Sequence, residues 1–396
     1  MAEDSVEEKL RDKGQTEMKH RILRLYLDPW IKKLSSSNSV SKLFFVDGFA
    51  GPGIYPDDTT GSPLIVMNKI DKVLSKTAVD GSIDEFECIF VEDDDDTYEQ
   101  LERNVTEHEA QVDHRIEPRC IPGEFEEWAT EFIGEYKQGH PPPTLIFVDP
   151  FGYSGLPFEL LSELFQLREK SLELLITFMS GKMAQWMDDP NHQKAITETL
   201  GLDHWRQHFD DDMPKDRRAQ VFSQLYQAQW RREADANFTF PFEMVEEGKR
   251  QTCYYLIHVT NHLDGLKVMK HTMFNAGAND QYAYLGPDHA GYEDDQLSFT
   301  DFGSTDNFDQ QIRSFAGGLH DRYNGEKMTL EELLSLTLDE NIFKVRHYRS
   351  AFEHLSKQDK LRIDGAEYTK GNNTGCEPDS EIEFVDLPTL SDFSDT

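Results

Sequence analysis

The stretch Leu43-Phe44-Phe45-Val46-Asp47-Gly48-Phe49-Ala50-Gly51-Pro52-Gly53 decides the fold. Its first four residues are apolar and predict a buried strand, which ends at the acidic Asp47. The glycines that follow permit positive φ angles and allow a ligand to approach the backbone closely. A strand that stops at an acid and continues into Gly-x-x-Gly-x-Gly is typical of an adenosyl-cofactor site in an α/β protein. The alternative for this segment taken alone is an ordinary turn from strand to helix.

Strands and helices alternate around this segment. Residues 16–34 carry apolar side chains at helical spacing, and Ser62-Pro63 suits a second helix start, because serine favours the N-cap and proline the first helical position. Nearly continuous apolar runs predict the further strands, and this alternation indicates a parallel sheet covered on both faces. The expected strands are residues 86–91, 119–121, 145–148 and 172–178, with a helix at 98–108 after the first of them.

The chain beyond residue 182 predicts how the sheet is completed. Residues 183–238 read as a mostly helical insertion. Residues 240–245 and 252–260 then predict two strands, joined by a hairpin at Glu246-Glu247-Gly248-Lys249, and a helix follows at 265–274. A five-strand α/β core that ends in an antiparallel hairpin is the usual sheet of a methyltransferase. We therefore expect the Rossmann-like fold of class I S-adenosylmethionine (SAM) methyltransferases, with seven strands, over residues 1–311.

The C-terminal part has a different character. Residues 280–311 are polar, whereas residues 330–338 and 345–355 predict two helices and residues 360–363 a short strand. This order predicts a winged-helix-like module over residues 312–375. The remaining residues, 376–396, are acidic and are expected to be disordered. Basic side chains are concentrated in the module, and we expect four of them to contact nucleic acid: Lys344, Arg346, Arg349 and Lys360.

The composition is that of a folded acidic protein. The 396 residues carry a net charge of −35, from 75 acidic and 40 basic side chains. One interpretation is a protein that avoids nucleic acid, because carboxylates repel phosphates. We favour a halophilic adaptation, in which an acidic surface stays hydrated and molar salt shortens the Debye length to about 3 Å. On this interpretation the net charge says little about nucleic-acid binding.

The sequence also bears on the cellular compartment. The four cysteines are far apart and form no CxxC pair, which suits a reducing environment and argues against a local zinc site. No apolar run is long enough to span a membrane, and the acidic start does not resemble a signal peptide. We expect a cytoplasmic protein without a metal site. His258 and His262 are four residues apart but straddle a strand end, so we interpret them as structural or surface residues.

Two more expected strands end in acids. Glu92 closes the strand 86–91, where a carboxylate is placed to accept hydrogen bonds from ribose hydroxyls. Glu92 lies farther from the first glycine than the usual spacing of about 20 residues. Inserted loops at residues 54–60 and 75–84 explain the longer spacing. The alternative is that Glu92 is one more surface acid.

The strand 145–148 continues into Asp149-Pro150-Phe151-Gly152-Tyr153. Methyltransferases that act on the amino groups of bases place an (Asp/Asn)-Pro-Pro-(Tyr/Phe) turn here. Asp149 would accept a hydrogen from the target amine as it becomes cationic, and either Phe151 or Tyr153 would stack on the base. Phe151 stands where the second proline is usual. A tight turn after a buried strand is the alternative.

Taken together, these motifs resemble the three-Cys-motif partner proteins over about residues 16–365. The segments that carry the resemblance are Thr16-Glu17-Met18-Lys19 with Tyr26-Leu27 and Trp30, Phe45 to Gly53, Gly61-Ser62-Pro63-Leu64, Phe147 to Ser154, Tyr254-Tyr255-Leu256-Ile257, and Gly265 to Lys270. That family is similar to class I SAM methyltransferases, and more distantly to ribosomal RNA adenine-N6 methyltransferases. The resemblance implies a partner that carries the three cysteines, an iron–sulfur protein of the radical-SAM type.

The resemblance also implies roles for individual residues. The glycine turn would hold the methionine end of SAM, Glu92 the ribose, and Glu124 would lie near the adenine, where Asp or Asn is usual. Asp149 would hold the target amine. Lys19 could reach the active site, but we favour the interpretation of an exposed helix lysine. The residues of the turn concerned are Asp47, Gly48, Phe49, Gly51 and Gly53.

Two functions remain open at this stage. The first is a SAM-dependent methyltransferase that acts on an exocyclic amine of a nucleic-acid base. The second is a non-catalytic protein of the same fold that regulates the three-Cys-motif protein or delivers substrate to it. A nuclease would need a cluster of acids and lysine, which the sequence does not show.

Overall fold

The computed structural model divides the chain into two compact units, Met1–Ala278 with Tyr282–Glu293, and Asn279–Gln281 with Asp294–Thr396. The sequence predicts that the C-terminal module starts at residue 312. In the structure, the first described helix of the second unit, α10, begins earlier, at Thr305. The structure describes residues 2–37, 39–76, 83–153, 156–168, 171–246, 251–277, 283–284, 305–364 and 376–385. For residues 2–13, 246, 284 and 305–309 it describes the backbone only.

The first unit is built on one sheet with the strand order β3-β2-β1-β4-β5-β7-β6-β8. The first five strands are parallel, and β7 then runs antiparallel to both β5 and β6. This is the methyltransferase sheet expected from the sequence, with a short β8 added at its edge. The strands are β1 Lys42–Asp47, β2 Glu85–Glu92, β3 Ile116–Pro122, β4 Thr144–Val148, β5 Leu172–Phe178, β6 Phe238–Glu246, β7 Gln251–Thr260 and β8 Ala283–Tyr284.

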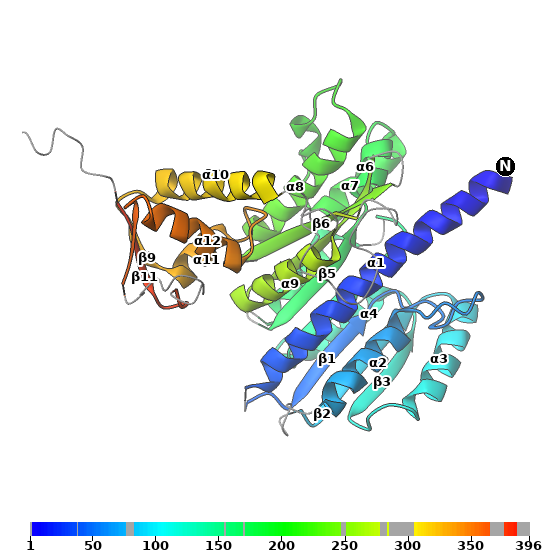
Figure 1. The fold of residues 1–396 in the computed structure, drawn as a ribbon. Coiled ribbons are helices and arrows are strands. Elements are labelled where there is room, and N and C mark those ends of the chain that lie inside the picture. The colour runs from blue at the N-terminus through cyan, green and yellow to red at the C-terminus, as the bar shows by residue number, and fades with distance from the viewer. Residues whose placement is uncertain are drawn as a thin grey trace, which may run out of the picture. The chain divides into compact units, whose positions relative to one another are not determined.

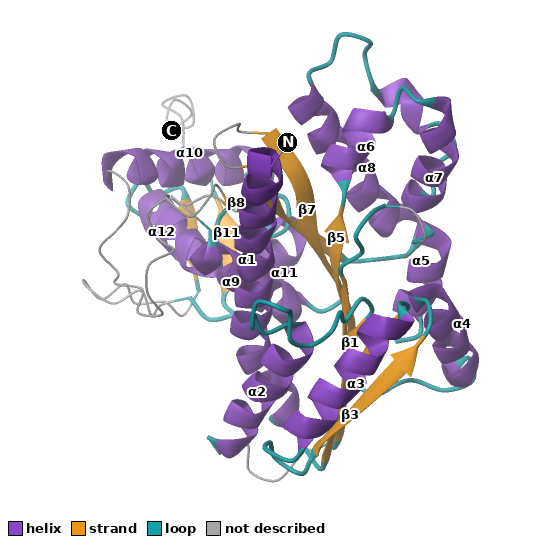
Figure 2. Ribbon diagram, turned by 90° about the vertical axis from the view of Figure 1, so that its right-hand side faces the viewer, coloured by secondary structure: helices purple, strands orange, loops and turns teal. Residues whose placement is uncertain are grey.

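Helices cover both faces of this sheet. The helices α1, α2 and α9 lie side by side on one face (Figure 1), whereas α4, α5 and α8 pack on the other, where a single apolar core joins them to the strands. Figure 2 shows α4, α5 and α7 following one another along that second face. The helices of the unit are α1 Ala2–Ser35, α2 Ser62–Ser75, α3 Asp95–Glu109, α4 Phe125–Tyr136, α5 Phe158–Gln166, α6 Ser180–Trp186, α7 Pro190–Leu200, α8 Lys215–Glu233 and α9 Leu263–Ala276.

The sequence patterns explain most of these elements. The central strands β1, β4 and β5 are buried over nearly their whole length, as continuous apolar runs between two helix layers require. Gly61, rather than Ser62, is the N-cap of α2, so Ser62 is its first helical residue. Between β5 and β6 the described chain is mostly helical, with α6, α7, α8 and the short 3₁₀ helix Trp205–His208. The hairpin turn expected at residues 246–249 lies almost entirely outside the described residues.

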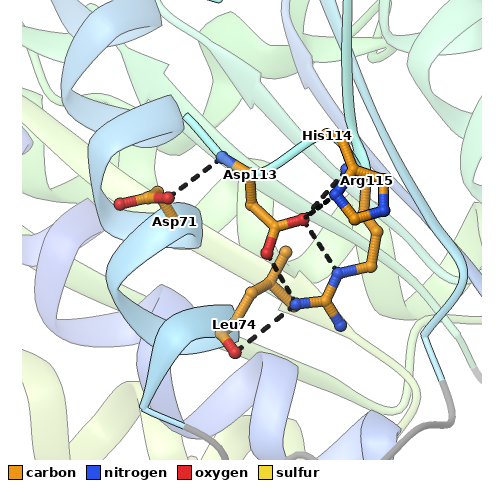
Figure 3. Close-up of polar contacts among 5 residues, drawn as sticks. All are labelled: Asp71, Leu74, Asp113, His114 and Arg115. Atoms are coloured by element: carbon orange, nitrogen blue, oxygen red, sulfur yellow. Dashed lines mark hydrogen bonds and ion pairs between the residues drawn. The ribbon is translucent and has the colours of Figure 1, made fainter. Parts of the chain in front are cut away.

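The loop that leads into β3 is fixed at the amino end of the sheet. Asp113 accepts hydrogen bonds from Arg115 Nε at 2.9 Å and from its terminal nitrogen Nη2 at 2.7 Å (Figure 3). Asp71 of α2 accepts the backbone N–H of Asp113 at 3.0 Å. The Arg115 guanidinium lowers the pKa of Asp113 to about 2. This ion pair joins the last turns of α2 to the start of β3.

The second unit contains the helices α10 Thr305–Tyr323, α11 Leu330–Thr337 and α12 Val345–Ser356, and a three-stranded sheet of order β10-β11-β9. Its strands are β9 Lys327–Thr329, β10 Leu361–Ile363 and β11 Glu381–Phe384, and both strand pairs are antiparallel. The expectation of disorder from residue 376 onward is wrong for residues 376–385. Ile382 and Phe384 alternate with acids, which gives β11 one buried face and one solvated face.

Candidate active site

The acids singled out in the sequence meet at the carboxyl edge of the sheet. Asp47 is the last residue of β1 and Glu92 the last residue of β2, while Asp149 directly follows β4. Because β1 pairs with both β2 and β4 in parallel register, these three strand ends are neighbours. The order of the strands therefore brings together three side chains that are 45 and 57 residues apart along the chain.

The glycine turn is held to both neighbouring strands by its backbone. Gly48 N–H donates to Phe147 of β4 at 2.9 Å, and Ala50 N–H donates to Val91 of β2 at 2.9 Å. Gly51 and Gly53 have φ angles of +63° and +75°, which L side chains rarely adopt. Gly48 has a different requirement, because a Cβ there would collide with the Phe125 ring.

Phe49 packs against that same ring. Its centroid is 5.7 Å from the centroid of Phe125, in the first turn of α4. Aromatic pairs at this spacing contribute about 1 kcal/mol beyond the area they bury. Phe49 and Gly48 thus attach the turn to α4, so these two positions support the shape of the site and need not touch a ligand themselves.

Asp47 is fully buried and only partly hydrogen-bonded. Its Oδ1 accepts the N–H of Phe49 at 3.2 Å, while its Oδ2 has no hydrogen-bond partner among the described residues. Burial raises the pKa of Asp47 to about 7, against the lowering effects of the Ser62 hydroxyl and the Phe49 N–H. A buried carboxylate oxygen without a partner is costly, and such groups persist at functional sites where a ligand supplies the donor.

Glu92 accepts two backbone hydrogen bonds. One comes from Gly51 N–H at 2.8 Å and the other from Asp94 N–H at 3.2 Å. Burial raises the pKa of Glu92, and these two hydrogen bonds oppose the rise. A carboxylate has about four acceptor positions, so Glu92 keeps capacity for hydroxyl donors while it is held rigidly against the glycine turn. It is buried rather than one more acid on the surface.

Glu124 lies beside Glu92 at the edge of the sheet. The N–H of Gly123 donates to the backbone oxygen of Glu92 at 3.0 Å, and Glu124 is the next residue, at the N-cap of α4. The Glu124 side chain is exposed and makes no capping hydrogen bond. Its backbone is therefore at the site, and its carboxylate is available to a ligand.

Asp149 is paired with a lysine from the first helix. Lys19 Nζ lies 2.6 Å from Oδ1 and 2.5 Å from Oδ2 of Asp149. Lys19 is 8% exposed, so the interpretation of Lys19 as an exposed helix lysine is wrong. Its ammonium also lies 5.5 Å from the centre of the Tyr254 ring. The apolar side of α1 faces the sheet, and this orientation turns Lys19 toward Asp149.

The two aromatic residues of the Asp149 turn have opposite environments. Phe151 is 89% exposed, whereas Tyr153 is 7% exposed and its hydroxyl bonds to His192 Nδ1. Burial raises the pKa of Tyr153. Pro150 is buried and restricts the backbone of the turn. Of the two candidates for stacking on a base, Phe151 is available to a ligand and Tyr153 is part of the support for the turn.

Tyr55 is a site residue that the sequence did not indicate. Its hydroxyl lies 3.2 Å from the position that a Cβ on Gly51 would occupy. Burial raises the pKa of Tyr55, and the charges of Asp47, Asp149 and Glu92 raise it further. Tyr55 follows the glycine turn in a polar loop, where no periodic pattern shows the direction of a side chain.

The basic residues expected to bind nucleic acid in the second unit are less accessible than the sequence suggested. Lys344 is 6% exposed, which is not the placement of a lysine that contacts phosphate. Arg346 is half-buried and its Nε donates to His347 at 3.1 Å, while Arg349 and Lys360 are also half-buried. A helix that buries one face also covers the apolar stems of long side chains on that face. The number of basic residues in a segment does not show which of them are covered.

The two histidines interpreted as structural are confirmed in that role. His258 Nε2 lies 2.7 Å from Glu173 inside the core, and the His262 side chain caps α9 by accepting Asp264 N–H at 3.1 Å. Within the described part of the chain, no group of three or more His, Cys, Asp or Glu side chains is placed to hold a metal ion. None of the described helices has the length and apolar character needed to cross a membrane.

Comparisons with known proteins give likeness at the level of structure alone. No family model matches the chain, and no curated protein sequence does. An O-methyltransferase from Bacillus cereus in complex with SAH aligns over 61% of this chain and 80% of its own, with 11% identity and a TM-score of 0.30. The methyltransferase domain of bacterial CtHen1-CN aligns over 60% and 99%, with 10% identity and a TM-score of 0.29.

A loganic acid methyltransferase with SAH covers 63% of this chain and 96% of its own, with 6% identity and a TM-score of 0.27. The strand order of the sheet is what identifies the fold. The resemblance to the three-Cys-motif partner proteins stays a prediction.

Proposed function

We propose that this protein transfers a methyl group from SAM to an exocyclic amine of a nucleic-acid base. The observation that carries the proposal is the meeting of Asp47, Glu92 and Asp149 at one sheet edge, around a glycine turn. An adenosyl cofactor needs acceptors for an amino group and for ribose hydroxyls, and an amine substrate needs a carboxylate beside them.

The residues at this edge fit SAM. The buried Oδ2 of Asp47, which accepts no hydrogen bond from any described residue, and the left-handed turn at Gly51 and Gly53 suit the methionine end. Glu92 keeps acceptor positions for the ribose, and Glu124 is exposed beside it for the adenine side. The bound cofactor would supply a methyl group that its sulfonium already activates.

The protein's own part is to position the amine and manage its charge. Asp149 would accept a hydrogen from the amine, and its carboxylate would stabilise the positive charge that develops as the new C–N bond forms. Phe151, at the surface beside it, would stack on the base. Lys19 already holds both oxygens of Asp149, so the amine must share or displace that ion pair.

The decisive experiment follows labelled methyl groups from SAM into total RNA and DNA, at high and at moderate salt. We expect Asp149→Asn to lower the rate of transfer by about 100-fold or more, because one charge-stabilising group at a transition state is worth that much. Asp203→Asn is the matched control, because Asp203 is exposed and far along the chain from the site. Unlabelled nucleic acid with the wild-type protein, despite SAM binding, would contradict the proposal.

A second function has one observation in its favour. Both oxygens of Asp149 are occupied by Lys19, as expected of a protein that keeps the fold and does not transfer methyl groups. Such a protein would serve a three-Cys-motif partner of the iron–sulfur, radical-SAM type in the cytoplasm. SAM binding without methyl transfer, even with that partner added, would favour this function. If SAM does not bind, and Asp47→Ala changes nothing, both functions fail.

We also propose that the second unit is a winged-helix module. Its order of helix, strand, helix, helix, strand, strand, with β11 between β9 and β10, supports this. Because Lys344 is buried, docking to a partner protein is as consistent with its surface as binding to phosphates. Deleting the unit and measuring nucleic-acid and partner binding separately would decide between the two.

A further inference from the structure

A groove of about 980 Å³ begins at the Asp149 turn and runs between α1 and α2. Phe151 and Tyr55 line it at the end next to the site. All the residues that line the groove belong to the first unit. Its two helices, α1 and α2, are neighbours on one face of the sheet (Figure 1). The groove is therefore continuous with the proposed active site.

The two helices run in the same direction away from the site. Along α1, Lys19 meets Asp149 at the carboxyl edge of the sheet, and seven residues later Tyr26 meets Glu173 near the amino end of β5. α2 starts just after the glycine turn and ends beside Arg115, whose guanidinium reaches the Leu74 carbonyl. Residues with higher numbers on either helix thus lie farther from the site.

Polar side chains line the groove at helical spacing on both sides. On α1 they are Thr16, His20 and Arg24, which are four residues apart and span about 12 Å. On α2 they are Asn68, Lys69 and Lys72. Burial and the neighbouring Lys19 lower the pKa of His20 to about 4, so at neutral pH this ring is a neutral hydrogen-bonding group.

The charge of the lining changes along the groove. The acids Glu17 and Asp57 belong to its lining near the site, and the cations Arg24 and Lys72 lie at the far end. Both of these cations are exposed, and neither forms an ion pair with any residue that the structure describes. Lys69 is paired with Asp28 at 3.1 Å. Arg24 and Lys72 are therefore two cations of the groove lining that no described acid neutralises.

We infer that this groove binds the sugar–phosphate backbone of a single-stranded nucleic acid whose target base stacks on Phe151. The inference rests on the proposed function and names the form of its substrate. A base must leave its stack to reach Asp149, and Phe151 offers it a new stacking face at 89% exposure. Arg24 and Lys72 then meet phosphates of the flanking nucleotides, and the neutral polar groups meet sugars and phosphates between them.

The test measures binding of fluorescent single-stranded RNA and DNA oligonucleotides as a function of salt. The affinity for a single strand falls with salt with a slope of about 0.7 for each phosphate contact, on a log–log scale. Arg24→Gln and Lys72→Gln should each reduce the slope by about 0.7, and the double variant by about 1.4. Lys137→Gln, an exposed lysine at the end of α4, makes the same charge change and should leave the slope unaltered.

Phe151→Ala tests the other end of the groove. It should weaken binding of the strand and leave the salt slope unchanged, because stacking releases no counterions. Equal slopes for wild type and the double variant would overturn the inference, and so would an equal loss in Lys137→Gln. A duplex that binds as tightly as the single strand, with the same response to the variants, would overturn it as well.

Cofactor binding and methyl transfer, measured on the same variants, separate this inference from the proposed function. Methyl transfer that is lost in Asp149→Asn but unaffected in the double variant would refute strand binding in the groove and leave the proposed methyltransferase function standing. Strand binding that depends on Arg24 and Lys72, without methyl transfer by any form of the protein, would refute the function and leave the groove. Transfer to a free nucleoside should persist in the double variant, because a nucleoside has no flanking phosphates.

Discussion

The acidic side chains at the two edges of the central sheet, where its strands end and where they begin, differ in how fully they are hydrogen-bonded or ion-paired. At the carboxyl edge, Asp47 has an oxygen with no hydrogen-bond partner in the described part of the chain and a pKa of about 7, and burial also raises the pKa of Glu92. At the amino edge, the buried Glu173 is hydrogen-bonded to both Tyr26 and His258, and the half-buried Asp113 forms a bidentate ion pair with Arg115 and has a pKa of about 2. The carboxyl edge keeps polar groups open for a ligand at a cost in stability, and the amino edge offsets that cost.

The largest effect should come from breaking the amino edge at Glu173. Glu173→Ala leaves the Tyr26 hydroxyl and the His258 ring without their shared acceptor inside the core. Two buried groups without partners should lower the free energy of unfolding by about 3 kcal/mol. Urea unfolding followed by circular dichroism measures this loss, and SAM affinity of the folded fraction should stay the same.

Glu117→Ala is the control for Glu173, because Glu117 is an exposed glutamate on β3. It should change the free energy of unfolding by less than about 0.5 kcal/mol. Were Glu173→Ala as mild as its control, the amino edge would not be the stabilising end of the sheet.

The second largest effect concerns Asp47 at the carboxyl edge, where the substitution should raise the free energy of unfolding at high pH instead of lowering it. The unfolded chain releases the Asp47 proton near pH 4, while the folded protein keeps it until about pH 7. The stability due to this group is therefore present at low pH and lost as pH rises through that window. Between pH 5.5 and pH 8 the wild type should lose roughly 2 kcal/mol that Asp47→Asn does not lose.

Unfolding titrations of both proteins at the two pH values measure this difference, with Asp203→Asn as an exposed control. SAM affinity should fall in Asp47→Asn even though the folded state gains stability above pH 7. A variant that is less stable than wild type at pH 8 would show that Asp47 serves the fold rather than the ligand.

The smallest effect concerns the ion pair of Figure 3. Asp113→Asn should lower the free energy of unfolding by about 1 kcal/mol at pH 7, because the charged bidentate contact with Arg115 is lost. The folded pKa lies below the unfolded one, so this stability is present above about pH 4 and is lost as pH falls toward 2. Arg115→Lys keeps the positive charge but loses the bidentate geometry of the guanidinium. Its free energy of unfolding should lie between those of wild type and Asp113→Asn.

Much of the fold could be predicted from the sequence because local signals agree with the tertiary arrangement. The apolar runs at β1, β4 and β5 predict strands that really are buried on both faces, and β5 was predicted with its observed bounds. The helices α4 and α5 were not identified, and the short strands β8, β9 and β11 were missed because two to four residues hold too little pattern.

The candidate site could be predicted where a residue ends a strand. Asp47, Glu92 and Asp149 each follow an apolar run, so parallel pairing alone brings them together. Lys19 could not be assigned in this way, because its direction depends on which face of α1 packs against the sheet. Tyr55 and Arg24 reach the site and the groove through contacts with segments that are distant in the sequence. Such tertiary contacts leave no pattern in the local sequence.

An α/β protein whose strands end in acids around a glycine turn follows from the residue types alone, because apolar runs predict buried strands and glycines permit positive φ angles. The hydrogen bonding and exposure of the side chains at this site follow from the folded arrangement of the chain. In it, one oxygen of Asp47 has no hydrogen-bond partner among the described residues, Lys19 donates to both oxygens of Asp149, and Phe151 is exposed whereas Tyr153 is buried. The physical reason is that exposure and pairing depend on contacts between distant segments.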